Sequence, residues 1–388
     1  MQPLQILSIG LAIFTMLFGA GNVVFPLDLG RETGSMVWFA LAGLILTGVI
    51  VPLLGLVSSA LFNGDYKKFF RMTGVVPGAI LALVCMLLIG PFGAIPRCMT
   101  VAYAAVHWHL QGLSLFVFSL LMAILTFAAT LKRRYVVDVF GRIIGPIKIT
   151  LLLTIVALGL FSSVVPHKSS ITPCESFYKG FSEGYLTLDL LGTIFFSSLI
   201  VAGIRRHRKQ DGSEYSSQEI ARIGLKAGII GGGLLGVVYA GFCILAAKLS
   251  GDILGLGQDQ LLSGIATLVL GPRANILANI TMALACITTA IALTAVVADY
   301  VTNELFSGKV KYLHALLITV SLNFAMTNLG FAGISQVILP LAIICYPALI
   351  ALSLANMAHV FWGFDRVKLV TLSTLAITIV MHFFKSVM

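Results

Sequence analysis

The chain of 388 residues is 59% hydrophobic and only 10% charged, with a mean hydropathy of +1.02. An ordinary soluble domain carries roughly 25% charged residues, so this composition excludes a water-soluble globular protein. The formal net charge of +10 arises from 25 Lys and Arg against 15 Asp and Glu. The basic residues gather between apolar runs, which is typical of membrane topology signals and not of a nucleic-acid-binding patch.

Nearly all apolar residues fall into runs long enough to cross a hydrocarbon layer of roughly 30 Å as a helix. Strands of a membrane barrel would be about half as long and would alternate in polarity. We therefore predict an all-α polytopic membrane protein with about eleven transmembrane helices. The runs cover residues 4–29, 37–62, 77–106, 113–131, 139–164, 185–204, 223–249, 271–298, 313–329, 331–357 and 367–384.

Seventeen of the 25 Lys and Arg residues lie in alternate connections between these runs. The positive-inside rule assigns such connections to the cytoplasm. We therefore expect an integral, multi-pass protein of the plasma (inner) membrane with a cytoplasmic N-terminus and an outer C-terminus. The seventeen residues are Lys67, Lys68, Arg71, Lys132, Arg133, Arg134, Arg142, Arg205, Arg206, Arg208, Lys209, Arg222, Lys226, Lys309, Lys311, Arg366 and Lys368.

The first run contains the segment 19–22, which reads Gly-Ala-Gly-Asn and is soon followed by Phe-Pro at 25–26. Glycine and asparagine are poor helix formers, so we predict a break near the middle of this helix, although glycines at helix crossings can also serve close packing alone. Hydroxyls at residues 193, 197 and 198 predict a second interruption, within residues 191–198 of the sixth run. Broken helices at matching positions of two inverted halves indicate a transporter substrate site.

Four segments in chain order carry a family resemblance: residues 18–26, 90–97, 184–189 and 288–294. With them the chain resembles the branched-chain amino acid:cation symporter family, within the amino acid-polyamine-organocation superfamily, over nearly its whole length. The resemblance implies a leucine-transporter-like fold of two inverted five-helix repeats with helices 1 and 6 broken. A single transmembrane domain, 1–388, would comprise repeats at 1–164 and 180–357 and an extra helix at 366–388.

The same resemblance implies secondary import of Leu, Ile and Val by sodium symport with alternating access. The substrate's carboxylate end would be lined by Gly19, Ala20, Gly21 and Asn22, and its ammonium group would face Phe196, Ser197 and Ser198. Sodium would be bound by Asn22 and by a second set of oxygens, which suits a hard cation. That set comprises the hydroxyls of Thr288 and Thr289 and the carbonyls of Ala285, Thr15 and Phe18.

Each of these assignments has a structural alternative. Asn22 would serve equally as a simple helix cap, and threonines in membrane helices commonly bond back to their own helix. Three ionisable residues, Arg97, Lys148 and Asp189, lie in or beside apolar runs, where an ionisable group marks function by default. Asp189 is expected near the outer end of the sixth run, as a hydrated cap or an outer gate. Arg97 either turns toward the substrate or snorkels outward.

Lys148 stands where the family usually has an apolar residue. Its ammonium group could occupy the place of the second cation, in which case protons would replace sodium as the coupling ion. Retention of Thr288 and Thr289 favours sodium, and a lysine in the cytoplasmic half of the span can instead snorkel to the inner surface.

Other classes of protein fit the residues less well. An enzyme is not expected, because the closest histidine pair, His107 and His109, is accompanied by no nucleophile or phosphate-binding motif. A channel would need a continuous polar lining. A non-transporting amino acid sensor would use the same pocket, and only accumulation of substrate distinguishes it. We expect no cofactor besides the coupling ion, and as partners an amino acid and membrane lipid, with no nucleic acid and no obligate protein partner.

Overall fold

The computed structural model describes residues 2–131, 150–159, 170–205 and 214–387. Within these ranges the chain is helical and has no strand. Seven helical stretches there are long and apolar enough to span a membrane, and four shorter apolar helices accompany them. Each of the eleven predicted runs overlaps one of these eleven stretches, so the predicted all-α polytopic architecture is confirmed.

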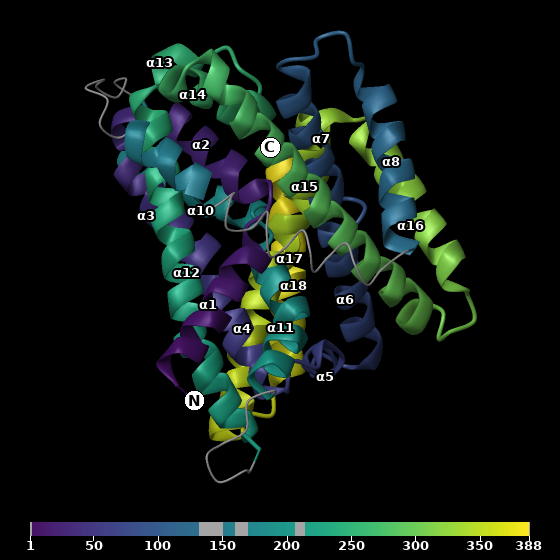
Figure 1. Cartoon of the computed structure of the whole chain (residues 1–388). Helices are drawn as coiled ribbons and strands as arrows, with labels where there is room; N and C mark the ends of the chain where they lie inside the picture. Colours follow the sequence, from purple (N-terminus) through teal and green to yellow (C-terminus); the bar gives the residue numbers. More distant parts are fainter. Residues whose placement is uncertain (1, 132–149, 160–169, 206–213, 388) are drawn as a thin grey trace.

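The helices follow one another along the chain as shown in Figure 1. They are α1 (Pro3–Leu17), α2 (Gly21–Thr33), α3 (Val37–Ile45), α4 (Val51–Leu61), α5 (Tyr66–Arg71), α6 (Val75–Ile89), α7 (Ala94–His107), α8 (Leu115–Leu131), the helix Thr150–Gly159, α10 (Pro173–Leu186), α11 (Asp189–Arg205), α12 (Ser217–Lys248), α13 (Ser250–Ile253), α14 (Leu261–Leu270), α15 (Pro272–Tyr300), α16 (Tyr312–Thr327), α17 (Gly330–Trp362) and α18 (Val367–Val387). Short 3-10 turns, Gly34–Met36 and Gln258–Gln260, and π-helical segments, η2 (Leu46–Ile50) and η4 (Val301–Leu305), join some of them.

Both predicted helix breaks are present, but the second lies elsewhere than expected. The first span breaks between α1 and α2, at the predicted glycines. The sixth breaks between α10 and α11, at Thr187 and Leu188, whereas residues 191–198 form continuous helix. The hydroxyls that suggested a break are satisfied within the helix: Thr193 donates to the Leu190 carbonyl at 2.8 Å and Ser197 to that of Ile194 at 2.6 Å. Such bonds leave the helical ladder intact.

The first half of the sixth span was not visible as an apolar run. α10 begins at Pro173, and Glu175, Lys179 and Glu183 interrupt its apolar pattern. Thr172 caps its start by accepting a hydrogen bond from the Glu175 amide, in a capping box. The helix therefore adds a half-span before the run that composition alone identifies.

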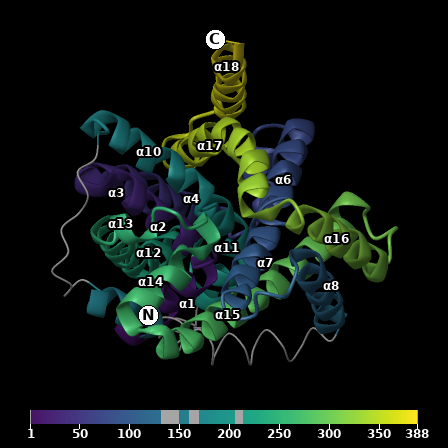
Figure 2. The same cartoon turned by 90° about the horizontal axis from the view of Figure 1, so that it is seen from above.

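The broken helices lie within the body of the molecule. α12 packs against α1, α2 and α4, and α11 packs against α1 and α4. α15 packs along α7, with α8 and α16 outside them, and α18 contacts α17 and extends away from the rest of the body (Figure 2). α2 also contacts α7, so the first broken span lies beside the pair formed by α7 and α15.

The two ends of the molecule differ in charge. α1 begins, α11 ends and α17 connects to α18 at the end where α5 lies (Figure 1). We call this the basic end, because α5 carries Lys67, Lys68 and Arg71 and α11 ends at Arg205. α13 and α14 lie at the opposite end, toward which α18 runs. The described basic connections therefore share one side, as the topology argument requires.

Candidate substrate and cation site

The first break brings unsatisfied backbone to the centre of the molecule. The Asn22 side-chain oxygen accepts a hydrogen bond from the Gly19 amide at 2.8 Å, which holds the turn between α1 and α2. The first N–H groups of any helix lack intrahelical acceptors and carry partial positive charge. Farther along α2, Pro26 has no N–H to give to the Asn22 carbonyl. The break thus offers donors to an anion and a carbonyl to a cation.

The second break is built around a strained residue. Leu188 adopts a φ of 62°, in the left-handed region that costs a non-glycine residue roughly 1 kcal/mol. Backbone strain of this kind gathers at functional sites, where the surrounding structure enforces it. It ends α10 at Leu186, leaving that carbonyl outside the helical ladder, and it lets α11 start again at Asp189.

Side chains connect the two breaks directly. The Asn22 side-chain amide donates to both carboxylate oxygens of Asp189 at 2.8 Å, and the Tyr239 hydroxyl on α12 donates to one of them at 2.7 Å. Asp189 is only 2% exposed. The expectation that it is a hydrated cap at the outer end of span six is therefore wrong, whereas a gating role stays a prediction. Because α10 supplies the outer half of that span, position 189 falls at the break.

A cavity of about 500 Å³ lies between the two helix breaks and the helices α7 and α15. This volume falls within the range of small-molecule sites. Its lining includes most of the residues that the sequence nominated. These are Thr15, Gly19, Ala20, Gly21, Asn22, Arg97, Asp189, Phe196, Ala285, Thr288 and Thr289.

Three nominated residues do not line this cavity. The Phe18 ring stacks on Phe14 at a centroid distance of 5.2 Å. Ser197 forms a 2.6 Å hydrogen bond with Ser59 of α4, and Ser198 is exposed and is not part of the lining to which Phe196 contributes. Successive residues of a helix project about 100° apart, so residues 196–198 cannot form one wall once α11 is continuous.

The threonines of α15 meet at one carbonyl. The hydroxyls of Thr288 and Thr289 both donate to the Ala285 carbonyl at 2.9 Å, and Thr15 donates to Leu11 at 2.9 Å. A hydroxyl that donates one hydrogen bond keeps lone pairs for a cation. Back-bonding and sodium ligation are therefore compatible, and four of the five residues whose oxygens were nominated for the second cation position line the cavity.

Arg97 lies inside the protein. The α6–α7 interruption at Gly90-Pro91 turns α7, and Arg97 is 2% exposed and lines the cavity. Its outward snorkelling is thereby excluded. Lys148, by contrast, lies outside the described residues.

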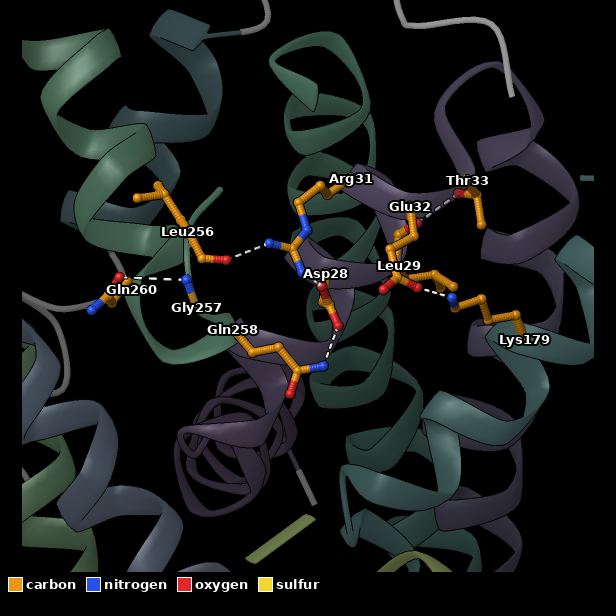
Figure 3. A network of polar contacts seen from close by, with 10 residues as sticks. All are labelled: Asp28, Leu29, Arg31, Glu32, Thr33, Lys179, Leu256, Gly257, Gln258 and Gln260. Atoms are coloured by element: carbon orange, nitrogen blue, oxygen red, sulfur yellow. Dashed lines mark hydrogen bonds and ion pairs between the residues drawn. The ribbon is translucent and has the colours of Figure 1, made fainter. Parts of the chain in front are cut away.

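The cavity extends toward the basic end, and polar contacts hold α2 to the connection between α13 and α14 at the opposite end. Its lining includes Leu199 of α11 and Asp299 of α15, and both helices run toward the basic end (Figure 1). At the opposite end, Arg31 binds the Asp28 carboxylate and donates to the Leu256 carbonyl at 2.6 Å (Figure 3). Gln258 also donates to Asp28, so the connection between α13 and α14 is held to α2. The sequence reading missed Asp28, although an acidic residue in the first apolar run is the same signal that singled out Asp189.

We predict that the Arg31–Asp28 contact closes the cavity, so that its loss exposes the cavity from the end opposite the basic loops. The Arg31 side chain is 11% and that of Asp28 2% exposed, so Arg31→Met removes a largely buried bridge. We expect cavity-lining Cys98 to react several-fold faster with a membrane-impermeant thiol reagent applied to intact cells, in a Cys174→Ser background that removes the exposed thiol.

Lys179→Met provides the control for that labelling. It breaks the neighbouring Lys179–Glu32 pair, in which both side chains are about one third exposed. Such exposed pairs contribute little, so labelling should match the wild type. Equal labelling of Cys98 in the Arg31 variant and in the wild type would rule out the closing role.

Comparison with known proteins decides the family. The model of the family described as branched-chain amino acid transport protein matches residues 3–388. The chain belongs to this family. It is 33% identical over 356 residues to the branched-chain amino acid permease BraB of Bacillus subtilis (strain 168), covering 89% of this chain and 78% of that protein. It is 29% identical over 374 residues to the permease BrnQ of Escherichia coli (strain K12), covering 92% and 81%.

Solved structures establish the fold. The inward-facing structure of Mhp1 superposes with a TM-score of 0.68 at 13% identity, covering 98% of this chain and 90% of that one. A closed structure of Mhp1, a nucleobase-cation-symport-1 family transporter, gives a TM-score of 0.62 at 13% identity, covering 96% and 91%. The predicted leucine-transporter-like architecture is confirmed, and the family's members are multi-pass membrane permeases.

Proposed function

We propose that this protein imports the branched-chain amino acids Leu, Ile and Val by sodium symport with alternating access. The observation that carries the proposal is the contact of Asn22 with Asp189, which joins two helix breaks over a cavity large enough for one amino acid. The names of the related permeases support the substrate class. The aliphatic side chain would rest on apolar residues of the cavity, including Leu17, Phe196 and Ile291.

Each end of the substrate would meet a group of suitable charge. The N-terminus of α2 favours the carboxylate, because helix N-termini bind anions. The Asp189 carboxylate favours the ammonium group, replacing the wall that we expected from Ser197 and Ser198. Sodium would bind to Thr15, Ala285, Thr288 and Thr289, which line the same cavity. The basic end would be cytoplasmic, and the repeats would occupy residues 1–164 and 180–357, with residues 366–388 as an extra helix.

The experiment is radiolabelled leucine uptake into proteoliposomes, with a sodium gradient and a proton gradient imposed separately. Accumulation under the sodium gradient alone is the expected result. Accumulation under the proton gradient alone would overturn sodium coupling, and Lys148→Leu would then test the lysine alternative. Binding without accumulation under either gradient would indicate a sensor.

Thr288→Ala is expected to raise the sodium concentration for half-maximal uptake about tenfold or more, the scale on which metal sites respond to loss of a supporting group. Thr294→Ala is the matched control. Thr294 lies on the same helix, donates to the Ala290 carbonyl at 2.7 Å and does not line the cavity. Equal sodium dependence of the two variants would contradict the cation assignment.

A further inference from the structure

Arg97 carries a buried charge that the described residues satisfy incompletely. One guanidinium nitrogen donates to the Leu186 carbonyl at 2.6 Å, and the guanidinium carbon lies 5.1 Å from the centre of the Phe25 ring. Its Nε has no hydrogen-bond acceptor, and no carboxylate forms an ion pair with it, in the part of the chain that the structure describes. Burying such a cation without an anion is costly. An anion that entered the cavity would offset this cost.

The place that Arg97 occupies is already suited to an anion. A Cβ built on Gly21, the first residue of α2, would lie 3.6 Å from the Leu186 carbonyl oxygen, the same oxygen that Arg97 binds. The guanidinium and the N-terminus of α2, a helix of 13 residues, therefore converge beside one carbonyl. Arg97 and Gly21 both line the cavity. A helix N-terminus attracts a carboxylate through its N–H groups, and a guanidinium binds one through its planar fork of donors.

The negative counterpart is Asp189, which is bonded to Asn22 in the first turn of α2. Asp189 is held by Asn22 and Tyr239, and it makes no ion pair with Arg97 although both line the cavity. A positive and a negative group that are not paired with each other in a low-dielectric cavity favour a ligand that carries both charges. Free α-amino acids are such ligands, whereas amines, amino alcohols and 2-oxo acids each lack one of the charges.

We infer that Arg97 binds the substrate's α-carboxylate and thereby restricts this transporter to free α-amino acids. The inference rests on the proposed function, because it assigns a role within that same cavity. It separates two tasks: the apolar lining selects aliphatic side chains, and Arg97 selects the carboxylate. A purely structural arginine, holding the end of α10 through Leu186, would affect all ligands of the cavity alike.

The test compares leucine with leucinol, in which a hydroxymethyl group replaces the carboxylate. Both compete with radiolabelled leucine for binding to the purified full-length protein in sodium-containing buffer, in wild type, Arg97→Gln and Arg97→Lys. Because hydrogen bonds between charged groups are strong, we expect the wild type to prefer leucine by about 10- to 100-fold. Arg97→Gln should lose most of this preference through weaker leucine binding with leucinol binding retained. Arg97→Lys should be intermediate, since lysine keeps the charge without the fork.

Arg205→Gln is the control, because this arginine is exposed at the basic end, where it donates to Asn63. It should preserve the leucine preference. If Arg97→Gln fails to fold, Arg97→Lys decides the question by the same ratio. A wild-type preference retained in both Arg97 variants would overturn the inference and leave the proposed function standing. A wild type that binds no leucine would instead overturn the proposed function itself.

Discussion

Asp189→Asn is expected to abolish measurable leucine accumulation in proteoliposomes. The substitution keeps the size of the side chain but removes its charge, and it presents an amide donor where Asn22 and Tyr239 already donate. Loss of one partner of a buried charged pair costs about 2 to 5 kcal/mol, which lowers affinity by roughly 30-fold or more. Equilibrium leucine binding and uptake should therefore both fall.

Asp365→Asn is the matched control for Asp189→Asn. The Asp365 side chain is 89% exposed near the basic end, so its neutralisation should leave uptake unchanged. Thermal unfolding of the purified variants in detergent establishes that both are folded. Uptake by Asp189→Asn within twofold of the wild type would show that the ammonium group is recognised elsewhere, and the contact between the two breaks would then be structural.

Gly180→Ala is expected to lower the melting temperature of the protein in detergent and to reduce the yield of folded transporter. Gly180 lies where α10 crosses α3, and a Cβ there would overlap the backbone carbonyl of Ala40. The backbone cannot retreat as a flexible side chain can, so the cost should reach or exceed the ~1 to 3 kcal/mol typical of overpacked cores. Because α10 ends at Leu186, its displacement would also disturb the carbonyl that Arg97 binds.

Gly233→Ala separates this steric effect from a general effect of adding a methyl group. Gly233 lies in the interior of α12, and a Cβ there would meet nothing within 4 Å. Alanine is the better helix former by about 1 kcal/mol, so the melting temperature should stay level or rise. A Gly180→Ala protein as stable as wild type would imply that α3 and α10 can separate without loss of the fold.

The amino-acid sequence by itself determined the class of the protein, its spans and much of its site. The hydrocarbon layer demands about twenty apolar residues for each helix, and this constraint is visible in composition alone. The break at residues 19–22 was equally visible, because glycine and asparagine have low helix propensity. The sequence segments around Arg97 and Thr288 were nominated for the site, and the structure places both residues in the lining of one cavity.

The tertiary structure decided where span six breaks and which side chains line the cavity. The hydroxyls at residues 193 and 197 signal a break only if they are not bonded to their own helix, and local sequence does not settle that. Tyr239 stood in an apolar run like any other aromatic residue. Asp189 lies at the helix break because α10 forms the half-span that precedes it. The polar residues of α10 keep this half-span from standing out as an apolar run. Long-range packing, and not periodicity, therefore brought Asn22, Tyr239 and Asp189 together.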